Sequence, residues 1–265
     1  MIQLNRFPEG RKGALTFSYD DGPANDVRLT ELFRRYEVGA TFHLNSKNYT
    51  DFDGAQIAEL RARYAGFEIS CHTVHHGFPT LMQPQTVVAE TLQDRRTLEA
   101  IAGYPVKGMS YPYGASDAQS VAAMRACGIV YSRTTASTNW FSLPEDFLHW
   151  NPTCHHGNAL ALCDRFLERV RGSYGGLLFY IWGHSYEFRT EGDWAVMEQI
   201  LQKLARNPDI WYASNMEIYR YVQALRQLEI SADESVLYNP SALPVWVEKD
   251  RDTVVRVGAG ETVHL

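Results

Sequence analysis

The stretch ALTFSYDDGP, residues 14–23, decides the fold of this chain. Its apolar part, residues 14–19, predicts a buried strand, and the polar residues that follow predict a turn. Residues 26–36 then carry apolar side chains at the spacing of one face of a helix. A strand that leads through a polar turn into a helix is the repeating unit of parallel α/β folds.

The same unit recurs along the chain to about residue 228. Further strands are predicted at residues 39–44, 67–71, 106–111, 128–132, 177–182 and 210–213. Further helices are predicted at residues 53–64, 85–102, 118–127, 159–171, 194–206 and 215–228, with an irregular stretch at 134–156. This repetition favours a barrel of parallel strands over a dinucleotide-binding sheet, because no GxGxxG sequence follows the first strand.

The last part of the chain has a different pattern. Short strands are predicted at residues 235–238, 245–247, 253–257 and 262–265, and Asn-Pro, Lys-Asp and Gly-Ala-Gly sequences separate them. We therefore predict two parts, a catalytic barrel over residues 1–230 and a small β appendage over residues 231–265. The appendage is expected to cap the barrel, with sugar binding as the alternative.

Composition excludes several classes of function. The chain has 265 residues and a net charge of −6, without a basic run that would indicate nucleic acid or an anionic membrane as a partner. It has no apolar run of the length of a membrane span and no visible signal peptide, so a cytoplasmic location is expected. The four cysteines are predicted to be buried thiols, with Cys154 and Cys163 as the pair that would bridge in an oxidising compartment.

Four of the predicted strands end in residues that can bind a metal or transfer a proton. These residues are Asp20 and Asp21 after the first strand, His72, Thr73, His75 and His76 after the third, Pro112, Tyr113 and Gly114 after the fourth, and His184 after the strand at 177–182. Parallel α/β folds carry their chemistry at the carboxyl ends of the strands. We therefore expect these side chains to lie close together.

Each group also has a simpler interpretation. Asp20 and Asp21 could cap the helix that follows them. On an extended chain, however, neighbouring side chains point in different directions, so one aspartate could bind a metal while the other faces a substrate. His72 and His76 are spaced to share one face of a helical turn, although His72 with His75 fits the spacing as well. Two imidazoles and a carboxylate with open positions are typical of a catalytic zinc site.

Four segments, in this order, resemble the motifs of the NodB-type polysaccharide deacetylases (carbohydrate esterase family 4). TFSYDDG at residues 16–22 resembles the first motif, commonly TFDDG, and HTVHH at residues 72–76 resembles the second, H-[ST]-x-x-H. YPYG at residues 111–114 resembles the third, R-x-P-Y-G, and IWGH at residues 181–184 resembles the last. The resemblance extends from about residue 13 to residue 228.

The resemblance implies a distorted, incomplete (β/α) barrel and a metal-dependent hydrolase that removes N-acetyl or O-acetyl groups from a carbohydrate. It implies that Asp21, His72 and His76 hold a divalent metal, most commonly Zn²⁺, with Co²⁺, Ni²⁺ or Mn²⁺ as alternatives. It also implies that Asp20 is the general base, that His184 is the general acid, and that the backbone N–H of Tyr113 stabilises the oxyanion. Thr73 would position the histidine loop. The implied partner is an acetylated oligo- or polysaccharide or a sugar conjugate.

The sequence departs from the family pattern at two motifs. The third motif usually begins with an arginine that pairs with the catalytic aspartate, and Ser110 occupies that position here, with Lys107 and Arg133 as candidate replacements. The fourth motif, an acidic residue followed by a tryptophan, is not clear. Trp140 lies in its place, as a wall of the substrate cleft or as a plug under a loop.

Other residues near these motifs have two interpretations. His155 and His156 could contact the substrate, approach the metal or lie at the start of a helix. Tyr186 and Glu187 could line the site or form hydrogen bonds within their own loop.

Three other functions compete with the deacetylase hypothesis. The first is a hydrolase of a non-peptide C–N bond in a small non-sugar molecule. The second is a catalytically degenerate carbohydrate-binding protein, which the missing arginine suggests and the presence of His184 argues against. The third is a Rossmann-type oxidoreductase, which the absent glycine fingerprint argues against.

Overall fold

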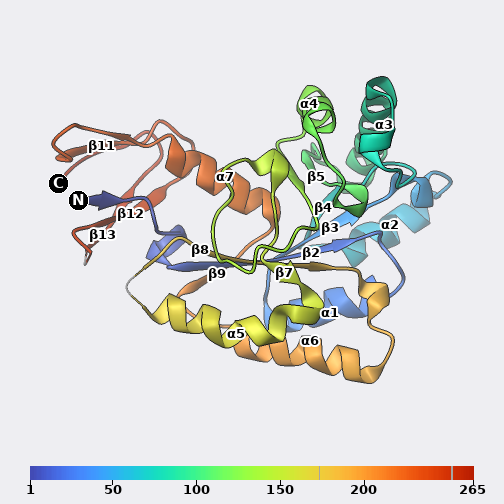
Figure 1. Cartoon of the computed structure of the whole chain (residues 1–265), viewed down its shortest axis with the longest axis horizontal. Helices are drawn as coiled ribbons and strands as arrows, with labels where there is room; N and C mark the ends of the chain where they lie inside the picture. Colours follow the sequence, from blue (N-terminus) through green and yellow to red (C-terminus); the bar gives the residue numbers. More distant parts are fainter. Residues whose placement is uncertain (173, 252) are drawn as a thin grey trace.

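The computed structural model describes residues 1–172, 174–251 and 253–265, and its centre is a curled parallel sheet with helices on its outside (Figure 1). The strand order is β6-β5-β4-β3-β2-β8-β7, and β9 also pairs with β2. The strands are β2 (Gly13–Asp20), β3 (Ala40–Leu44), β4 (Glu68–Cys71), β5 (Gly108–Ser110), β6 (Tyr131–Arg133), β7 (Cys154–His155), β8 (Leu177–Gly183) and β9 (Ile210–Tyr212). The helices are α1 (Asp26–Tyr36), α2 (Gly54–Arg63), α3 (Pro84–Ala102), α4 (Ala118–Ala126), α5 (His156–Arg171), α6 (Glu191–Leu204) and α7 (Asn215–Arg226).

The two edges of this sheet, β6 and β7, are joined by the segment that precedes β7. Trp150 forms a parallel bridge with Arg133 of β6, and the Trp150 N–H donates to the Ser132 carbonyl at 2.9 Å. A few residues later, β7 pairs with β8. The sheet therefore curls back toward itself, which confirms the predicted distorted and incomplete barrel.

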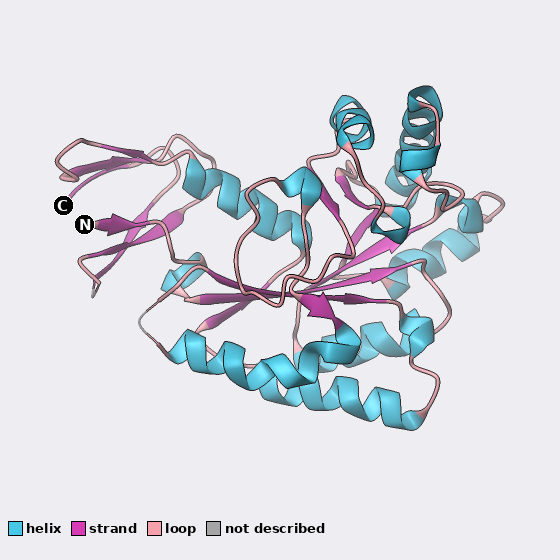
Figure 2. Ribbon diagram, viewed as in Figure 1, coloured by secondary structure: helices cyan, strands magenta, loops and turns pink. Residues whose placement is uncertain are grey.

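Each strand and helix predicted before residue 229 is present, with ends that differ by a few residues. α6 begins at Glu191 because Thr190 and Asp193 form a capping box there. β7 was not predicted, since it has two residues and lies in the stretch predicted to be irregular. Figure 2 shows the long loops that lead into it.

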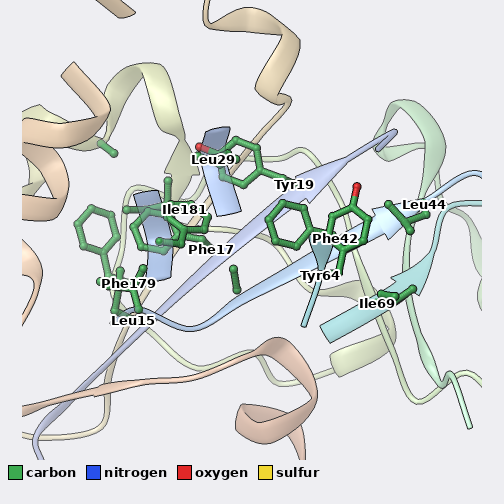
Figure 3. Packing of buried hydrophobic residues seen from close by; sticks show 14 of the residues in the cluster. Leu15, Phe17, Tyr19, Leu29, Phe42, Leu44, Tyr64, Ile69, Phe179 and Ile181 are labelled. Carbon is green, nitrogen blue, oxygen red and sulfur yellow. The ribbon is translucent and has the colours of Figure 1, made fainter. Parts of the chain in front are cut away.

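Side chains along the central strands alternate between an apolar outer face and a polar inner face. The apolar alternates form one buried cluster with the helices, as Figure 3 shows for Leu15, Phe17 and Tyr19 of β2, Phe42 and Leu44 of β3, and Leu29 of α1. The buried polar alternates include Thr16, Ser18 and Asp20 of β2, Thr41 and His43 of β3, and Ser70 of β4. Because the strand period is two, the same alternation that builds the core sends Asp20 to the inner face.

Polar contacts cross the inside of the curled sheet. Arg133 of β6 donates from Nε to the Ser18 hydroxyl of β2 at 3.2 Å, although these two strands are not neighbours. The Ser70 and Tyr131 hydroxyls lie 3.1 Å apart, and a Cβ at Gly108 would lie 2.1 Å from the Tyr131 oxygen. The interior is thus filled by hydrogen-bonded polar groups, which buried polar atoms require.

The N-terminus of α7 closes the amino end of the barrel. The fully buried Asn215 donates from its backbone N–H to the Thr41 hydroxyl at 2.9 Å and from Nδ2 to the Tyr180 hydroxyl at 2.6 Å. The Met216 N–H donates to the Glu68 carboxylate at 2.8 Å. A carboxylate is favourable at a helix N-terminus, so α7 stabilises the half-buried Glu68 while blocking this end of the barrel.

The predicted appendage consists of two small antiparallel sheets. One contains β1 (Ile2–Gln3), β12 (Val245–Lys249) and β13 (Thr253–Val257), and the other contains β10 (Glu229–Ile230), β11 (Val236–Tyr238) and β14 (Thr262–His264). Val245, Val247 and Val257 pack in one buried cluster with residues of α7. The division at residue 231 stays a prediction. In the structure, β1 from the start of the chain pairs with β12 of the appendage.

The structure bears on two expectations from composition, the state of the cysteines and the presence of membrane-spanning helices. All four cysteines are buried free thiols, as predicted, and the Cys154–Cys163 bridge is not formed. Within the described ranges, no helix has the length and apolar character to cross a membrane.

β2 has two different partners along one of its sides. β9 pairs with Gly13–Leu15, and β3 pairs with Phe17–Asp20. The start of β3 and the end of β9 therefore meet, and a Cβ at Gly39 would lie 2.6 Å from the Ala213 carbonyl carbon. Gly39 is needed here because two backbones approach each other too closely for a side chain.

We expect Gly39→Ala to lower the free energy of unfolding by about 1–3 kcal/mol, because rigid backbone must move to admit the new methyl group. Gly54→Ala is the matched control, since a Cβ at Gly54 has no neighbour within 4 Å. That change should alter stability by less than about 1 kcal/mol. Urea unfolding of both variants measures the difference, and equal effects would show that the close approach does not matter.

Candidate metal centre and catalytic site

Asp21, His72 and His76 converge at the carboxyl end of the barrel. Nε2 of His72 lies 3.6 Å from Oδ1 of Asp21, and Nε2 of His76 lies 3.7 Å from the same oxygen. One ligand atom from each residue lies within 4.8 Å of the other two. The structure thus brings together the three residues predicted as metal ligands, and their role as ligands stays a prediction.

The loop after β4 brings the two histidines together, whereas the sequence suggested a helical turn. Thr73 and His76 have positive φ values, 64° and 54°, so the chain reverses without forming a helix. The Thr73 hydroxyl accepts from the His76 N–H at 3.1 Å, as expected for a residue that positions this loop. Nδ2 of Asn45 donates to the His72 and Thr73 carbonyls at 2.7 and 3.1 Å.

The alternative pairing of His72 with His75 is not the one that approaches Asp21. Nδ1 of His75 lies 2.7 Å from the Glu90 carboxylate, and the His75 N–H donates to the same carboxylate at 2.9 Å. The His75 side chain is 59% exposed. Glu90 thus holds His75 on the outer side of the loop.

Ser110 fixes the tautomer of His72. Nδ1 of His72 lies 2.8 Å from the Ser110 carbonyl oxygen and 2.7 Å from its hydroxyl. Because a carbonyl oxygen only accepts, Nδ1 carries the hydrogen and the Nε2 lone pair faces Asp21. Burial lowers the pKa of His72 and favours the neutral form that binds metals. This donor set, with its supported histidine, fits a divalent metal.

Arg133 supplies the positive charge that the third motif lacks. Its guanidinium is fully buried and forms an ion pair with Asp20 through Nη2, and Nη1 donates to the Thr134 carbonyl at 3.0 Å. Arg133 is the direct neighbour of Ser110 in the parallel pairing of β5 with β6. The positive charge therefore lies on the neighbouring strand β6, at the same level of the barrel as the usual third-motif position on β5. Lys107, the other candidate, is exposed.

Asp20 is a buried carboxylate inside this polar network. The Ser110 hydroxyl donates to its Oδ1 at 3.2 Å. Burial acts to raise the pKa of Asp20, but the Arg133 charge and the nearby imidazoles outweigh burial and lower this pKa. Helix capping is not its role, because α1 has Asn25 at its N-cap position.

His184 lies between two carboxylates. Its Nε2 is 4.0 Å from Oδ2 of Asp21, and its Nδ1 is 3.4 Å from Oε2 of Glu187. The His184 backbone N–H donates to the same Glu187 oxygen at 3.0 Å. Burial acts to lower the pKa of His184, but the carboxylates of Glu187, Asp20 and Asp21 outweigh burial and raise it. Glu187 has an orienting position that its place in the sequence suggested only weakly.

His155 and His156 approach the same Glu187 oxygen as His184. Nε2 of His155 is 2.9 Å from Oε2 of Glu187, and Nε2 of His156 is 3.5 Å from it. His155 is the N-cap of α5 and accepts from the Gly157 N–H at 3.3 Å, so the helix-start interpretation is confirmed for it. Neither histidine belongs to the cluster around Asp21.

Exposed aromatic rings flank the Asp21 cluster. The ring of Tyr113 stacks on Phe78 with centroids 3.8 Å apart and lies 4.6 Å from the His76 ring. The ring of Tyr186 stacks on His184 with centroids 4.9 Å apart. Trp140 is 63% exposed, so it is not a plug under a loop. Tyr113, Phe78 and Tyr186 therefore present accessible ring faces beside the histidines.

Comparisons with known proteins point to one family. The family model for polysaccharide deacetylase matches residues 8–132. YheN of Bacillus subtilis (strain 168), whose name assigns it to the polysaccharide deacetylases, is 30% identical over 129 residues, which are 46% of this chain and 45% of that protein. The chain thus spans less than half the length of the curated relatives that it matches.

Solved structures share the fold. A crystal structure from Mycobacterium smegmatis, described as a polysaccharide deacetylase, superposes with a TM-score of 0.65 at 17% identity, covering 83% of this chain and 93% of the other. The chitin deacetylase of Colletotrichum lindemuthianum superposes with a TM-score of 0.56 at 17% identity, covering 78% and 87%. The match to the family model over residues 8–132 and the shared fold confirm the resemblance of this chain to the polysaccharide deacetylases.

Proposed function

We propose that this chain is a metal-dependent hydrolase that removes N-acetyl groups from a carbohydrate. The convergence of Asp21, His72 and His76 beside Asp20 and His184 carries the proposal. The similarity to polysaccharide deacetylases supports carbohydrate deacetylation as the general activity.

Asp21, His72 and His76 would hold the metal. Two imidazole nitrogens and one carboxylate suit Zn²⁺ best, with Co²⁺, Ni²⁺ and Mn²⁺ as alternatives. When bound, the metal would polarise the acetyl carbonyl and lower the pKa of a water molecule toward about 7. Three protein ligands leave positions open for water and substrate, as in catalytic zinc sites.

The chain's own groups would perform the proton transfers. Asp20, held ionised by Arg133 and oriented by Ser110, would accept a proton from the attacking water. His184, oriented by Glu187, would donate a proton to the departing amine. The Tyr113 N–H would stabilise the oxyanion, a contribution of about 3–4 kcal/mol for a well-placed donor.

The aromatic rings indicate a sugar substrate. Tyr113, Phe78 and Tyr186 are each more than 40% exposed beside the catalytic histidines. Flat apolar rings with polar edges pack well against sugar rings. We therefore propose an acetylated oligo- or polysaccharide as the substrate. An O-acetyl ester is the close variant, because its leaving group depends less on a proton from His184.

A catalytically degenerate binding protein is the weaker alternative. The missing motif-three arginine favours this alternative, but Arg133 provides a positive charge beside Ser110. A pure binding protein has no use for a buried base and an oriented acid. A small non-sugar amide as the substrate differs from an acetylated sugar in one observable, the release of acetate from the sugar.

The first prediction from the proposed function concerns metal binding and acetate release. The metal-loaded protein should release acetate from an acetylated chito-oligosaccharide, and a chelator should abolish the release. Asp21→Ala, His72→Ala and His76→Ala should each lose tight metal binding, while Asp20→Asn should keep the metal and lose at least about 100-fold in kcat.

His75→Ala is the matched control and should keep both metal and activity. If His75→Ala lost the metal while His76→Ala kept it, the ligand assignment would be wrong. Bound metal without acetate release from any acetylated sugar would favour the small non-sugar amide.

The second prediction concerns the displaced arginine. Arg133→Ala leaves the Asp20 carboxylate buried and unpaired, so we expect a loss of about 3–5 kcal/mol in the free energy of unfolding. The double variant Ser110→Arg/Arg133→Ala returns the charge to the usual third-motif position. It should recover part of both the stability and the kcat lost by Arg133→Ala. Urea unfolding and steady-state kinetics test this, and an Arg133→Ala variant with full activity would contradict the role of the pair.

The third prediction concerns sugar stacking. Tyr186→Ala should raise KM for an acetylated chito-oligosaccharide by about 2–10-fold, since one aromatic contact contributes about 0.5–1.5 kcal/mol. Tyr174→Ala is the control, because Tyr174 is 79% exposed and precedes β8 at the opposite end of the barrel. Equal KM values for the two variants would exclude Tyr186 from the substrate contact.

A further inference from the structure

A second group of metal-binding side chains lies beside the first. One ligand atom from each of His155, His156 and Glu187 lies within 4.8 Å of the other two. Both imidazole Nε2 atoms face the same oxygen, Oε2 of Glu187, at 2.9 and 3.5 Å. Two imidazoles and one carboxylate are the same donor types as in the proposed catalytic centre.

The junction of β7 and α5 produces this convergence. Side chains of adjacent residues usually diverge, but His155 ends a strand with ψ 148° and His156 begins a helix. Their ring centroids are only 4.2 Å apart.

Tyr19 supports His156 from behind. Its hydroxyl lies 3.2 Å from Nδ1 of His156, and the rings of Tyr19 and Phe188 both stack on that imidazole. When Nδ1–H donates to the phenol oxygen, the Nε2 lone pair faces Glu187. Such support of the second ring nitrogen is typical of histidine ligands to metals.

A cavity gives access to this group. It has a volume of about 220 Å³ and is lined by His156 and Glu187 together with Phe188, Asp193, Val196 and Met197. His155 is 28% exposed and Glu187 is 32% exposed, so a cation can reach both side chains. Binding of a metal to Nε2 of His155 would place the ring hydrogen on Nδ1. The exposed Gly157 N–H, which now donates to Nδ1, would then donate to water instead.

We propose that His155, His156 and Glu187 form a second divalent-metal site, one that selects Zn²⁺-like cations. Two nitrogens and one carboxylate oxygen suit a late first-row divalent ion, and the cavity leaves room for water as a further ligand. This assignment does not depend on the proposed deacetylase function.

A consequence for activity does rest on the proposed function. Oε2 of Glu187 also lies 3.4 Å from Nδ1 of His184. A cation at the second site would compete with His184 for this oxygen and would remove the support of the proposed general acid. Excess Zn²⁺ should therefore inhibit acetate release after the first equivalent has activated it.

The test is the metal stoichiometry of the whole chain. The metal-free protein is dialysed to equilibrium against Zn²⁺, and bound metal is measured by plasma mass spectrometry. We expect a second equivalent in the unmodified chain, loss of this equivalent in His155→Ala and in His156→Gln, and loss of the other equivalent in Asp21→Ala. His264→Ala is the control, because His264 is exposed on β14, and it should keep both equivalents.

Two outcomes would overturn the site. One is a single equivalent in the unmodified chain at saturating Zn²⁺, and the other is a second equivalent that persists in both histidine variants. Circular dichroism shows whether each variant is folded, and the more exposed His155 provides a variant that should fold even if His156→Gln does not.

The inhibitory role is tested separately. Inhibition by excess Zn²⁺ should disappear in His155→Ala, and Tyr19→Phe should weaken the second equivalent by about 10-fold. If excess Zn²⁺ inhibited His155→Ala as strongly as the unmodified chain, the site would remain and its effect on His184 would be refuted. If the protein released no acetate, the number of bound metal ions could still be measured, so the second site is tested independently of the proposed function.

Discussion

The buried ion pair between Arg133 and Asp20 is the interaction on which the interior of this barrel depends. Removing two charges from water costs several kcal/mol per ion, and their attraction compensates only when the remaining polar atoms are also bonded. Here Ser18 of β2, Ser110 of β5 and Thr134 after β6 supply those bonds. The pair therefore requires the curl that brings β2 and β6 face to face, although they are separated in the strand order.

The candidate centre is built outward from this pair. Ser110 donates to Asp20 and accepts from His72, so one hydroxyl links the charged core to the first imidazole of the cluster. Asp21 follows Asp20 directly, and both carboxylates approach Nε2 of His72, but only the Asp21 carboxylate also lies near His76 and His184. Two adjacent carboxylates are thus given separate environments, one buried against a cation and one accessible beside imidazoles. This division permits a base and a metal ligand to come from consecutive residues.

Local patterns in the sequence predicted most of the fold and which side chains would lie close together at the candidate site. Alternation along β2 and helical spacing along α1 are local signals, and the polar ends of strands indicated where Asp21, His72 and His184 would meet. Spacing alone did not distinguish His76 from His75, because the difference depends on the backbone angles of a loop, and only the family resemblance implied His76. Assigning Arg133 to Asp20 required the pairing of β5 with β6, and placing β1 beside β12 required contacts across the whole chain. The position of Glu187 depends on the turn after β8 and on the junction of β7 with α5, which bring three histidines to one oxygen of this side chain.

The loops of the site share an unusual backbone conformation. Asp21, Thr73, His76 and Tyr113 are not glycines, yet each has a positive φ. Such residues cost on the order of 1–3 kcal/mol each, a strain that glycine would relieve. The chain therefore stores conformational energy where its proposed chemistry takes place, and selection for stability alone would replace these side chains with glycine. A descendant that had lost catalysis would be free to make those exchanges, so glycines at these positions would mark a relative in which the site has decayed.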